Sequence, residues 1–118
     1  MSKISVLVVG PPALSRVIKH LLAAEPDFEV IGSGRGLKSL SPGKKLPILI
    51  VASVRAVRSG VGDTVRAIKG ASPSSKLILL CPFDDFADSG RRYGADACLN
   101  PDKLVAQLIP TASALTPR

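Results

Sequence analysis

Hydrophobic residues fall in five short runs that more polar segments separate. The runs cover residues 4–9, 28–31, 48–52, 77–81 and 97–99. Their short length and their content of valine, isoleucine and leucine indicate strands rather than helices. Runs such as ILIVAS and LILLC are apolar without alternation, as in parallel strands that are covered on both faces. We therefore expect a parallel sheet with helices packed on its two sides.

Between these runs, apolar residues recur at the three- and four-residue spacing of amphipathic helices. Pro11 and Pro12 fit the start of the first helix, since a proline in the first turn loses no hydrogen bond. Arg16, Lys19 and His20 lie off its apolar stripe, which we expect to bury Leu14, Val17, Ile18, Leu21 and Leu22.

Two further helices are expected, in residues 60–70 and near the C-terminus. Their apolar faces comprise Val61, Val65, Ala67 and Ile68 in the former, and Leu104, Val105, Leu108 and Ile109 in the latter. The helix between the second and third strands is weaker, because it has only Leu37 and Leu40 and the sequence SPG ends it early. The alternation of strand and helix, repeated five times, predicts a doubly wound α/β domain with right-handed crossovers.

Length and composition fit one globular domain that spans residues 1–118. No apolar run is long enough to cross a membrane and no signal peptide precedes the first strand, so we expect a soluble, cytoplasmic protein without membrane contact. Cys81 and Cys98 lie in or at the end of apolar runs, which is typical of buried, inert thiols rather than of a disulfide or a redox switch.

The net charge of +7 is compatible with an acidic partner, but the basic residues are dispersed along the chain, which favours a solvated basic surface. The few aromatic residues provide no stacking platform, which argues against nucleic acid as a partner of this domain alone.

The carboxyl ends of the strands are the expected ligand site of such a sheet, and here the sequence resembles a known family. ISVLVVGPPALSRVIKHLLAAEPDFEVIGSG, LPILIVAS, SSKLILLCPFDD and YGADACLNPD are similar to the receiver domains of bacterial response regulators, over residues 4 to about 108. The nearest types are those of the chemotaxis methylesterase and of two-component transcription regulators. The resemblance implies a flavodoxin-like (βα)5 fold with a five-stranded parallel sheet in the order 2-1-3-4-5.

In working receivers the resemblance also implies phosphorylation of an aspartate, with an acidic pair that holds Mg²⁺, a hydroxyl and a lysine. Here the acidic pair falls on Gly10 and Pro11, and the phosphoacceptor falls on Ser53. The hydroxyl position falls on Cys81, and the lysine falls on Asn100 or Pro101. A hard cation needs carboxylate oxygens, and a serine cannot form an acyl phosphate. We therefore interpret the chain as a pseudo-receiver with a degenerate phosphorylation pocket, no metal and no cofactor.

Two features leave room for anion binding at the same edge. The sequence GSGRG with Arg35 suits either a phosphate cradle or a flexible connection. Arg55 and Arg58 suit either a phosphate contact or solvated loop positions.

We expect a signalling module that is not an enzyme and binds another signalling protein or a second copy of itself. The predicted surface is formed by the fourth helix, the fifth strand and the fifth helix, and would present Arg91, Arg92, Tyr93 and Lys103 to an acidic partner. The alternative function is a sensor of phosphate, nucleotide or polyanion through Arg35, Arg55 and Arg58. A conventional phosphorylated response regulator is a distant third.

Overall fold

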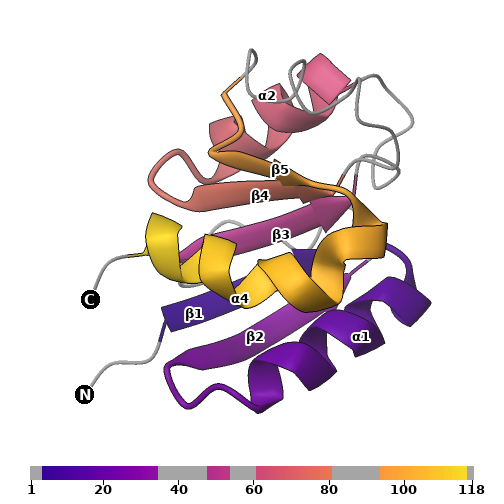
Figure 1. The fold of residues 1–118 in the computed structure, drawn as a ribbon. Helices are drawn as coiled ribbons and strands as arrows, with labels where there is room; N and C mark the ends of the chain where they lie inside the picture. Colours follow the sequence, from indigo (N-terminus) through magenta and orange to yellow (C-terminus); the bar gives the residue numbers. More distant parts are fainter. Residues whose placement is uncertain (1–3, 35–47, 54–60, 81–93, 117–118) are drawn as a thin grey trace.

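Five parallel strands form a single sheet in the order β2-β1-β3-β4-β5. The computed structural model describes residues 4–34, 48–53, 61–80 and 94–116. The strands are β1 (Ile4–Val9), β2 (Phe28–Gly34), β3 (Leu49–Ser53), β4 (Lys76–Leu80) and β5 (Ala97–Leu99). Every pair of neighbours in the sheet is parallel. The predicted strand order and the α/β architecture are thus confirmed (Figure 1).

Helices cover both faces of this sheet (Figure 1). Helix α1 (Pro12–Ala23) and helix α4 (Leu104–Leu115) lie on one face, and helix α2 (Val61–Ala71) lies on the other. A short 3₁₀ helix, η3 (Pro101–Lys103), connects β5 to α4. Within the described residues, no helix is long and apolar enough to cross a membrane.

The hydrophobic core is divided into two layers by the sheet. Alternate residues of a strand point to opposite faces, so Val6 and Val8 belong to the layer under α1 and α4, whereas Leu7 and Val9 belong to the layer under α2. The first layer includes Ile18 and Leu22 of α1 and Leu104, Leu108 and Ala112 of α4. The second includes Val65 and Ile68 of α2. Burial on both faces explains why the strands are apolar without alternation.

Strand β2 extends beyond its predicted end at residue 31. Gly32, Ser33 and Gly34 pair with Leu7, Val8 and Val9 of β1, so the first three of the five GSGRG residues are strand rather than connection. A Cβ atom at Gly32 would lie 3.3 Å from Leu7 Cδ1. Glycine therefore permits a close approach of the two strands here. Arg35 lies outside the described residues.

Two residues predicted to be buried in helices are exposed. Val17 of α1 is 44% exposed and Val105 of α4 is 74% exposed, although both share the helical spacing of buried neighbours. The buried residues of α1 are Ser15, Ile18 and Leu22, and those of α4 are Leu104, Leu108 and Ala112. Val17 precedes Ile18 and Val105 follows Leu104, so each lies on the flank of the buried stripe. Cys98 is half-buried rather than fully buried, because β5 is at the edge of the sheet.

Two predicted helices lie outside the described residues, the weak one after the second strand and the one before the fifth strand. The predicted C-terminal helix corresponds to α4.

Candidate functional site

The degenerate pocket predicted from the sequence lies at the carboxyl edge of the sheet. Gly10 follows β1, Ser53 ends β3, and Asn100 and Pro101 follow β5. Gly10 and Ser53 lie on neighbouring strands, because Val9 pairs with Ala52. Strand β4 separates Ser53 from Asn100, so at about 4.8 Å per strand the two strand ends are roughly 10 Å apart. Cys81 lies outside the described residues.

Gly10 and Ser53 are packed so closely that they leave no room for a larger residue at position 10 without adjustment. A Cβ atom built on Gly10 would lie 3.3 Å from Ser53 Cβ, 3.5 Å from Leu14 Cδ2 and 3.9 Å from Ser53 N. Gly10 is buried, and Ser53 is only 8% exposed. An aspartate at position 10 would carry its own Cβ into this contact. Any residue larger than glycine at position 10 therefore requires Ser53 to move by a few tenths of an ångström.

Pro11 and Pro12 form the start of helix α1. Pro11 is the N-cap residue with an extended backbone, and its carbonyl accepts a hydrogen bond of 3.0 Å from Ser15 N. Pro12 occupies the first turn, and the first turn contains no acidic residue. A proline at this place loses no helical hydrogen bond, so the two residues are explained by helix initiation.

Asn100 has a structural role in the turn that leads into α4. Its side-chain oxygen Oδ1 accepts a hydrogen bond of 3.0 Å from Asp102 N, which caps η3. Pro101 takes the first position of η3, where its missing N–H is not needed. Neither residue provides the positive charge that a lysine would bring to this edge.

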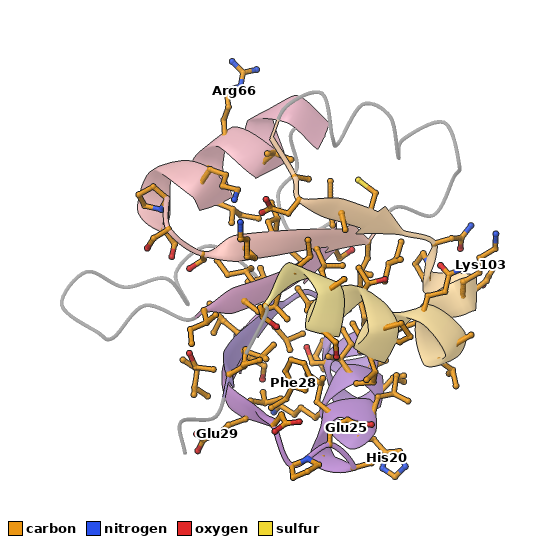
Figure 2. All side chains as sticks on the ribbon, turned by 60° about the vertical axis from the view of Figure 1, so that its left-hand side comes forward. His20, Glu25, Phe28, Glu29, Arg66 and Lys103 are labelled. Carbon is orange, nitrogen blue, oxygen red and sulfur yellow. The ribbon has the colours of Figure 1, made fainter. Side chains whose placement is uncertain are left out.

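Of the residues predicted to bind an anion or a partner, the structure describes Lys103. Lys103 is exposed at the end of η3 and projects outward, as Figure 2 shows. Most of the predicted anion-binding and partner residues lie outside the described residues: Arg55, Arg58, Arg91, Arg92 and Tyr93. Among the residues that the structure describes, no three His, Cys, Asp or Glu side chains are grouped to hold a metal ion.

A charged cluster that the sequence did not indicate connects α2 to the amino ends of β4 and β5. Lys69 Nζ donates to Asp96 Oδ2 at 2.8 Å and to the Ser75 carbonyl at 2.9 Å. Leu77 N donates to the same Asp96 oxygen at 2.8 Å. Burial raises the pKa of Asp96, but the hydrogen bonds from Lys69 and Leu77 and the charges of Lys69 and Lys76 lower this pKa more, so that it ends below its ordinary value. This cluster lies at the edge of the sheet opposite to Ser53.

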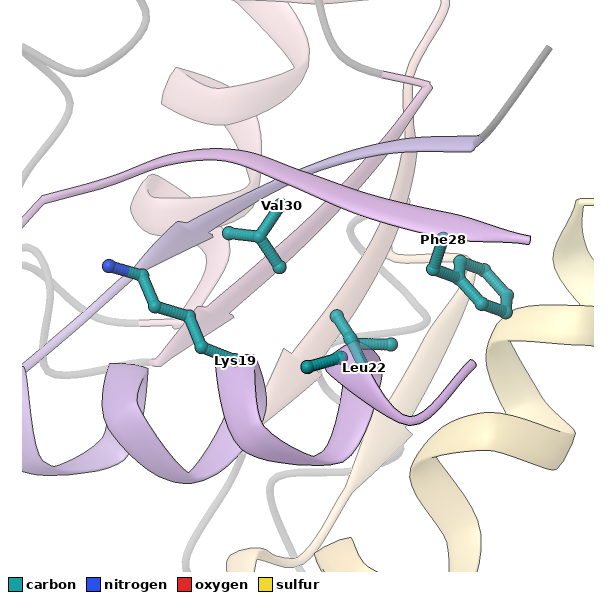
Figure 3. Close-up of a pocket in the computed structure, with 5 residues that line it drawn as sticks. Lys19, Leu22, Phe28 and Val30 are labelled. Atoms are coloured by element: carbon teal, nitrogen blue, oxygen red, sulfur yellow. The ribbon is translucent and has the colours of Figure 1, made fainter. Parts of the chain in front are cut away.

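A second feature that the sequence did not indicate is a hollow between α1 and β2, which we call the α1–β2 hollow. It has a volume of about 350 Å³ and is lined by Lys19, Leu22, Ala23, Phe28 and Val30 (Figure 3). The sequence placed Lys19 off the apolar stripe, and the small Ala23 was the only sign that the helix would leave space beside it.

No protein-family model matches the sequence, and no curated protein matches it. Solved structures do match the fold. The RcsB response regulator of Salmonella typhimurium, described for its conformational dynamism in DNA interaction, superposes with a TM-score of 0.84 at 15% identity, over 98% of this chain and 60% of RcsB. The signal receiver domain of the response regulator NarL from Mycobacterium tuberculosis gives a TM-score of 0.78 at 14% identity, over the full length of both chains.

This chain has the receiver-domain fold. A structure of CheY6 in complex with the P1 domain of CheA3 from R. sphaeroides also matches, with a TM-score of 0.79, 20% identity and 98% coverage of both chains. The predicted receiver fold is therefore confirmed. Sequence identities of 14–20% show a shared fold and do not show a shared function. The chain spans about 60% of the length of the RcsB regulator. Within a receiver fold, Gly10, Ser53 and Asn100 occupy the strand ends where ligands of doubly wound sheets bind.

Proposed function

We propose that this chain is a pseudo-receiver, a signalling module of two-component type that acts without phosphorylation of its pocket. The observation that carries the proposal is the chemistry of the residues at the ends of β1 and β3. Gly10 and Pro11 follow β1 and Ser53 ends β3, and none of the three has a carboxylate. The described positions of the pocket bear no carboxylate.

The chemistry of aspartyl phosphorylation has no support from these residues. Mg²⁺ takes oxygen ligands, preferably carboxylates, and neither Gly10 nor Pro11 has a side-chain oxygen. Ser53 has a hydroxyl where an acyl phosphate would need a carboxylate. The Asn100 side-chain oxygen accepts from Asp102 N as a cap. Loss of the metal ligands and of the nucleophile together favours a module that signals through its surface.

The proposed action is binding to a signalling protein or to a second copy of the chain. Structures with the same fold include a receiver with a P1 domain and a regulator described for DNA interaction, so this scaffold supports contacts with macromolecules. The proposed surface comprises β5, α4 and the helix expected before β5, with Lys103 at its described end. Its basic residues would attract an acidic surface on the partner. We place the module in the cytoplasm, as a single domain without a cofactor or enzymatic activity.

The test exchanges charge on the proposed surface and on a matched control surface. One variant is Arg91→Glu/Arg92→Glu. The control is Arg16→Glu/Arg66→Glu, which changes the net charge by the same amount at two exposed residues of α1 and α2; Arg66 projects away from the sheet in Figure 2.

Proteins captured from the native cell extract are quantified for the wild type and both variants. We expect a captured protein that is lost with Arg91→Glu/Arg92→Glu and is retained with the control variant. Equal capture by all three proteins would place the interface elsewhere.

A further inference from the structure

Helix α4 is uncharged along its whole length, although much of it is exposed. Its sequence, LVAQLIPTASAL, contains no Asp, Glu, Lys, Arg or His. One face is buried against the sheet, whereas Val105 is 74% exposed. A surface helix usually carries charged residues on the face that meets water, as α1 does with Arg16, and a helix that is apolar all round is usually covered. The outer face of α4 therefore has the composition of a contact surface.

Helix α1 extends this surface on one side. The two helices lie next to each other on the same face of the sheet (Figure 1). Lys19 and Ala23 of α1 line the α1–β2 hollow, so this flank of the helix faces the edge strand β2. Val17 lies two residues before Lys19, a rotation of about 200° around a helix, so it is on the opposite flank, toward α4. Val17 is 44% exposed.

On α4, Val105 shares a flank with Ile109, which packs against the core layer that α1 also covers. Exposed valines of both helices thus border the seam between them. We call the outward side of this helix pair the α1–α4 surface; it comprises the exposed residues 13, 16, 17 and 20 of α1 and 105–107, 110 and 114 of α4.

The charges of the α1–α4 surface lie on one of its two helices. Arg16 and His20 are its titratable residues on α1, and its α4 residues have none. A two-fold axis along the seam would place α1 of each copy over α4 of the other, so that Arg16 meets an uncharged helix. Such an isologous contact is self-complementary. It also limits the repulsion between two chains that each carry a net charge of +7.

We propose that two copies of this chain associate through the α1–α4 surface, with α1 of each copy on α4 of the other. The inference rests on the proposed function, in which a second copy is one of the two partners, and it names the surface of that contact. Two neighbouring 12-residue helices present a footprint about 18 Å long and about 20 Å wide. This footprint is smaller than the roughly 800 Å² per partner that a stable complex buries, so we expect a weak dimer with a dissociation constant of roughly 10⁻⁵–10⁻³ M.

The test is sedimentation velocity of the full chain from about 10 µM to about 1 mM, at low and at high NaCl concentration. We expect a shift from monomer to dimer as the protein concentration rises. Association should be as strong or stronger at high salt, because salt screens the repulsion between the two chains and does not weaken an apolar contact. A chain that stays monomeric throughout, or a dimer that salt dissociates, would overturn the inference. Either result leaves the proposed binding of another signalling protein intact, since the capture experiment tests that separately.

A charge in the apolar part of the surface should prevent the dimer. Val105→Glu places a carboxylate at an exposed position in the first turn of α4, where it is compatible with the helix, and should weaken association at least about tenfold. Ile48→Glu is the matched control, because Ile48 is 47% exposed and alternation places it on the side of Ile50, under α2. Circular dichroism confirms that both variants fold. A dimer retained in Val105→Glu, or lost equally in both variants, would contradict the α1–α4 surface.

The sign of a charge at position 107 tests which helix lies opposite α4. Gln107 is exposed, and in the proposed dimer a charge there is near Arg16 of the other copy. Gln107→Glu should therefore tighten the dimer about two- to fivefold, and Gln107→Lys should weaken it by a similar factor. Arg66→Gln makes the same change in net charge as Gln107→Glu, but on α2 at the other face of the sheet, and should leave the dissociation constant unchanged. The same response to Glu and to Lys at position 107 would refute the pairing of α1 with α4.

Discussion

Replacement of Gly10 by alanine tests whether the ends of β1 and β3 are packed as closely as the structure shows. The new Cβ would lie 3.3 Å from Ser53 Cβ, inside the ordinary carbon–carbon contact distance of about 3.5–4.0 Å. Ser53 has little freedom to move away, because β3 is buried and pairs with strands on both sides. The other contact, to Leu14 Cδ2 at 3.5 Å, involves the end of a half-buried side chain and can relax.

The change in the free energy of unfolding on Gly10→Ala is the sum of an overpacking cost and a gain from the less flexible unfolded chain. Overpacking a buried site costs about 1–3 kcal/mol. Replacing glycine by alanine where the backbone conformation is ordinary stabilises by about 0.4–1 kcal/mol through the unfolded state, and no positive φ is found at Gly10. We therefore expect Gly10→Ala to lower the free energy of unfolding by about 1 kcal/mol. In the Ser53→Gly background the opposing Cβ is absent, so the same change should be neutral or stabilising by about 0.5 kcal/mol.

The assay is denaturant unfolding of the wild type, both single variants and the double variant, followed by circular dichroism. The cycle should give a coupling free energy of about 1–2 kcal/mol between positions 10 and 53. A coupling within the roughly 0.3–0.5 kcal/mol of additive pairs would refute the close contact. Gly70→Ala is the control, because a Cβ at this exposed helical position meets nothing within 4 Å; it should stabilise the protein by about 0.5–1 kcal/mol in every background.

Three further outcomes are expected. Gly94 has a φ of 113°, and a Cβ there would meet only Val65 Cγ1, at an ordinary 3.8 Å. Gly94→Ala should therefore lower the free energy of unfolding by about 1–3 kcal/mol through backbone strain alone. An unchanged free energy of unfolding in urea would contradict the positive φ. Asp96 has a lowered pKa in the folded protein, so it stabilises the fold above the ordinary aspartate pKa of about 3.9 and this stability is lost as the pH falls through the folded pKa. Asp96→Asn should therefore lower the free energy of unfolding by about 1–2 kcal/mol at neutral pH and reduce the loss of stability that the wild type shows at acidic pH. Glu29→Gln should leave this loss at acidic pH unchanged. The same loss in wild type and Asp96→Asn would exclude the ion pair. Millimolar Mg²⁺ should raise the melting temperature no more than Na⁺ at equal ionic strength, and a specific rise of several degrees would reveal a metal site.

The sequence pattern predicted the parts of the fold that depend on apolar runs. Strands β1 and β5 have their predicted bounds, because each run is largely apolar and is followed by glycine or a polar residue. The end of β2 was missed, since Gly32 and Gly34 have the composition of a turn and only their pairing with β1 makes them strand. Helical spacing placed Val17 and Val105 in the core, but the width of the buried stripe depends on how each helix sits on the sheet.

The sequence also predicted part of the candidate site. That Gly10 and Ser53 meet follows from the strand order, which the resemblance supplied. The cap made by Asn100 is local, two residues from its donor Asp102 N, and an asparagine before Pro101 is a signal that could have indicated it. The ion pair of Lys69 with Asp96 joins positions 27 residues apart, so no local pattern specifies it. The α1–β2 hollow depends on how α1 packs beside β2.

The most direct measurement for the central claim is the intact mass of the protein after incubation with acetyl phosphate and Mg²⁺, with a working receiver domain in the same reaction as the positive control. Gly10 and Pro11 offer no metal ligand and Ser53 offers no carboxylate, so the mass of this chain should stay unchanged while the control gains one phosphate. A magnesium-dependent gain of one phosphate on this chain would contradict the account.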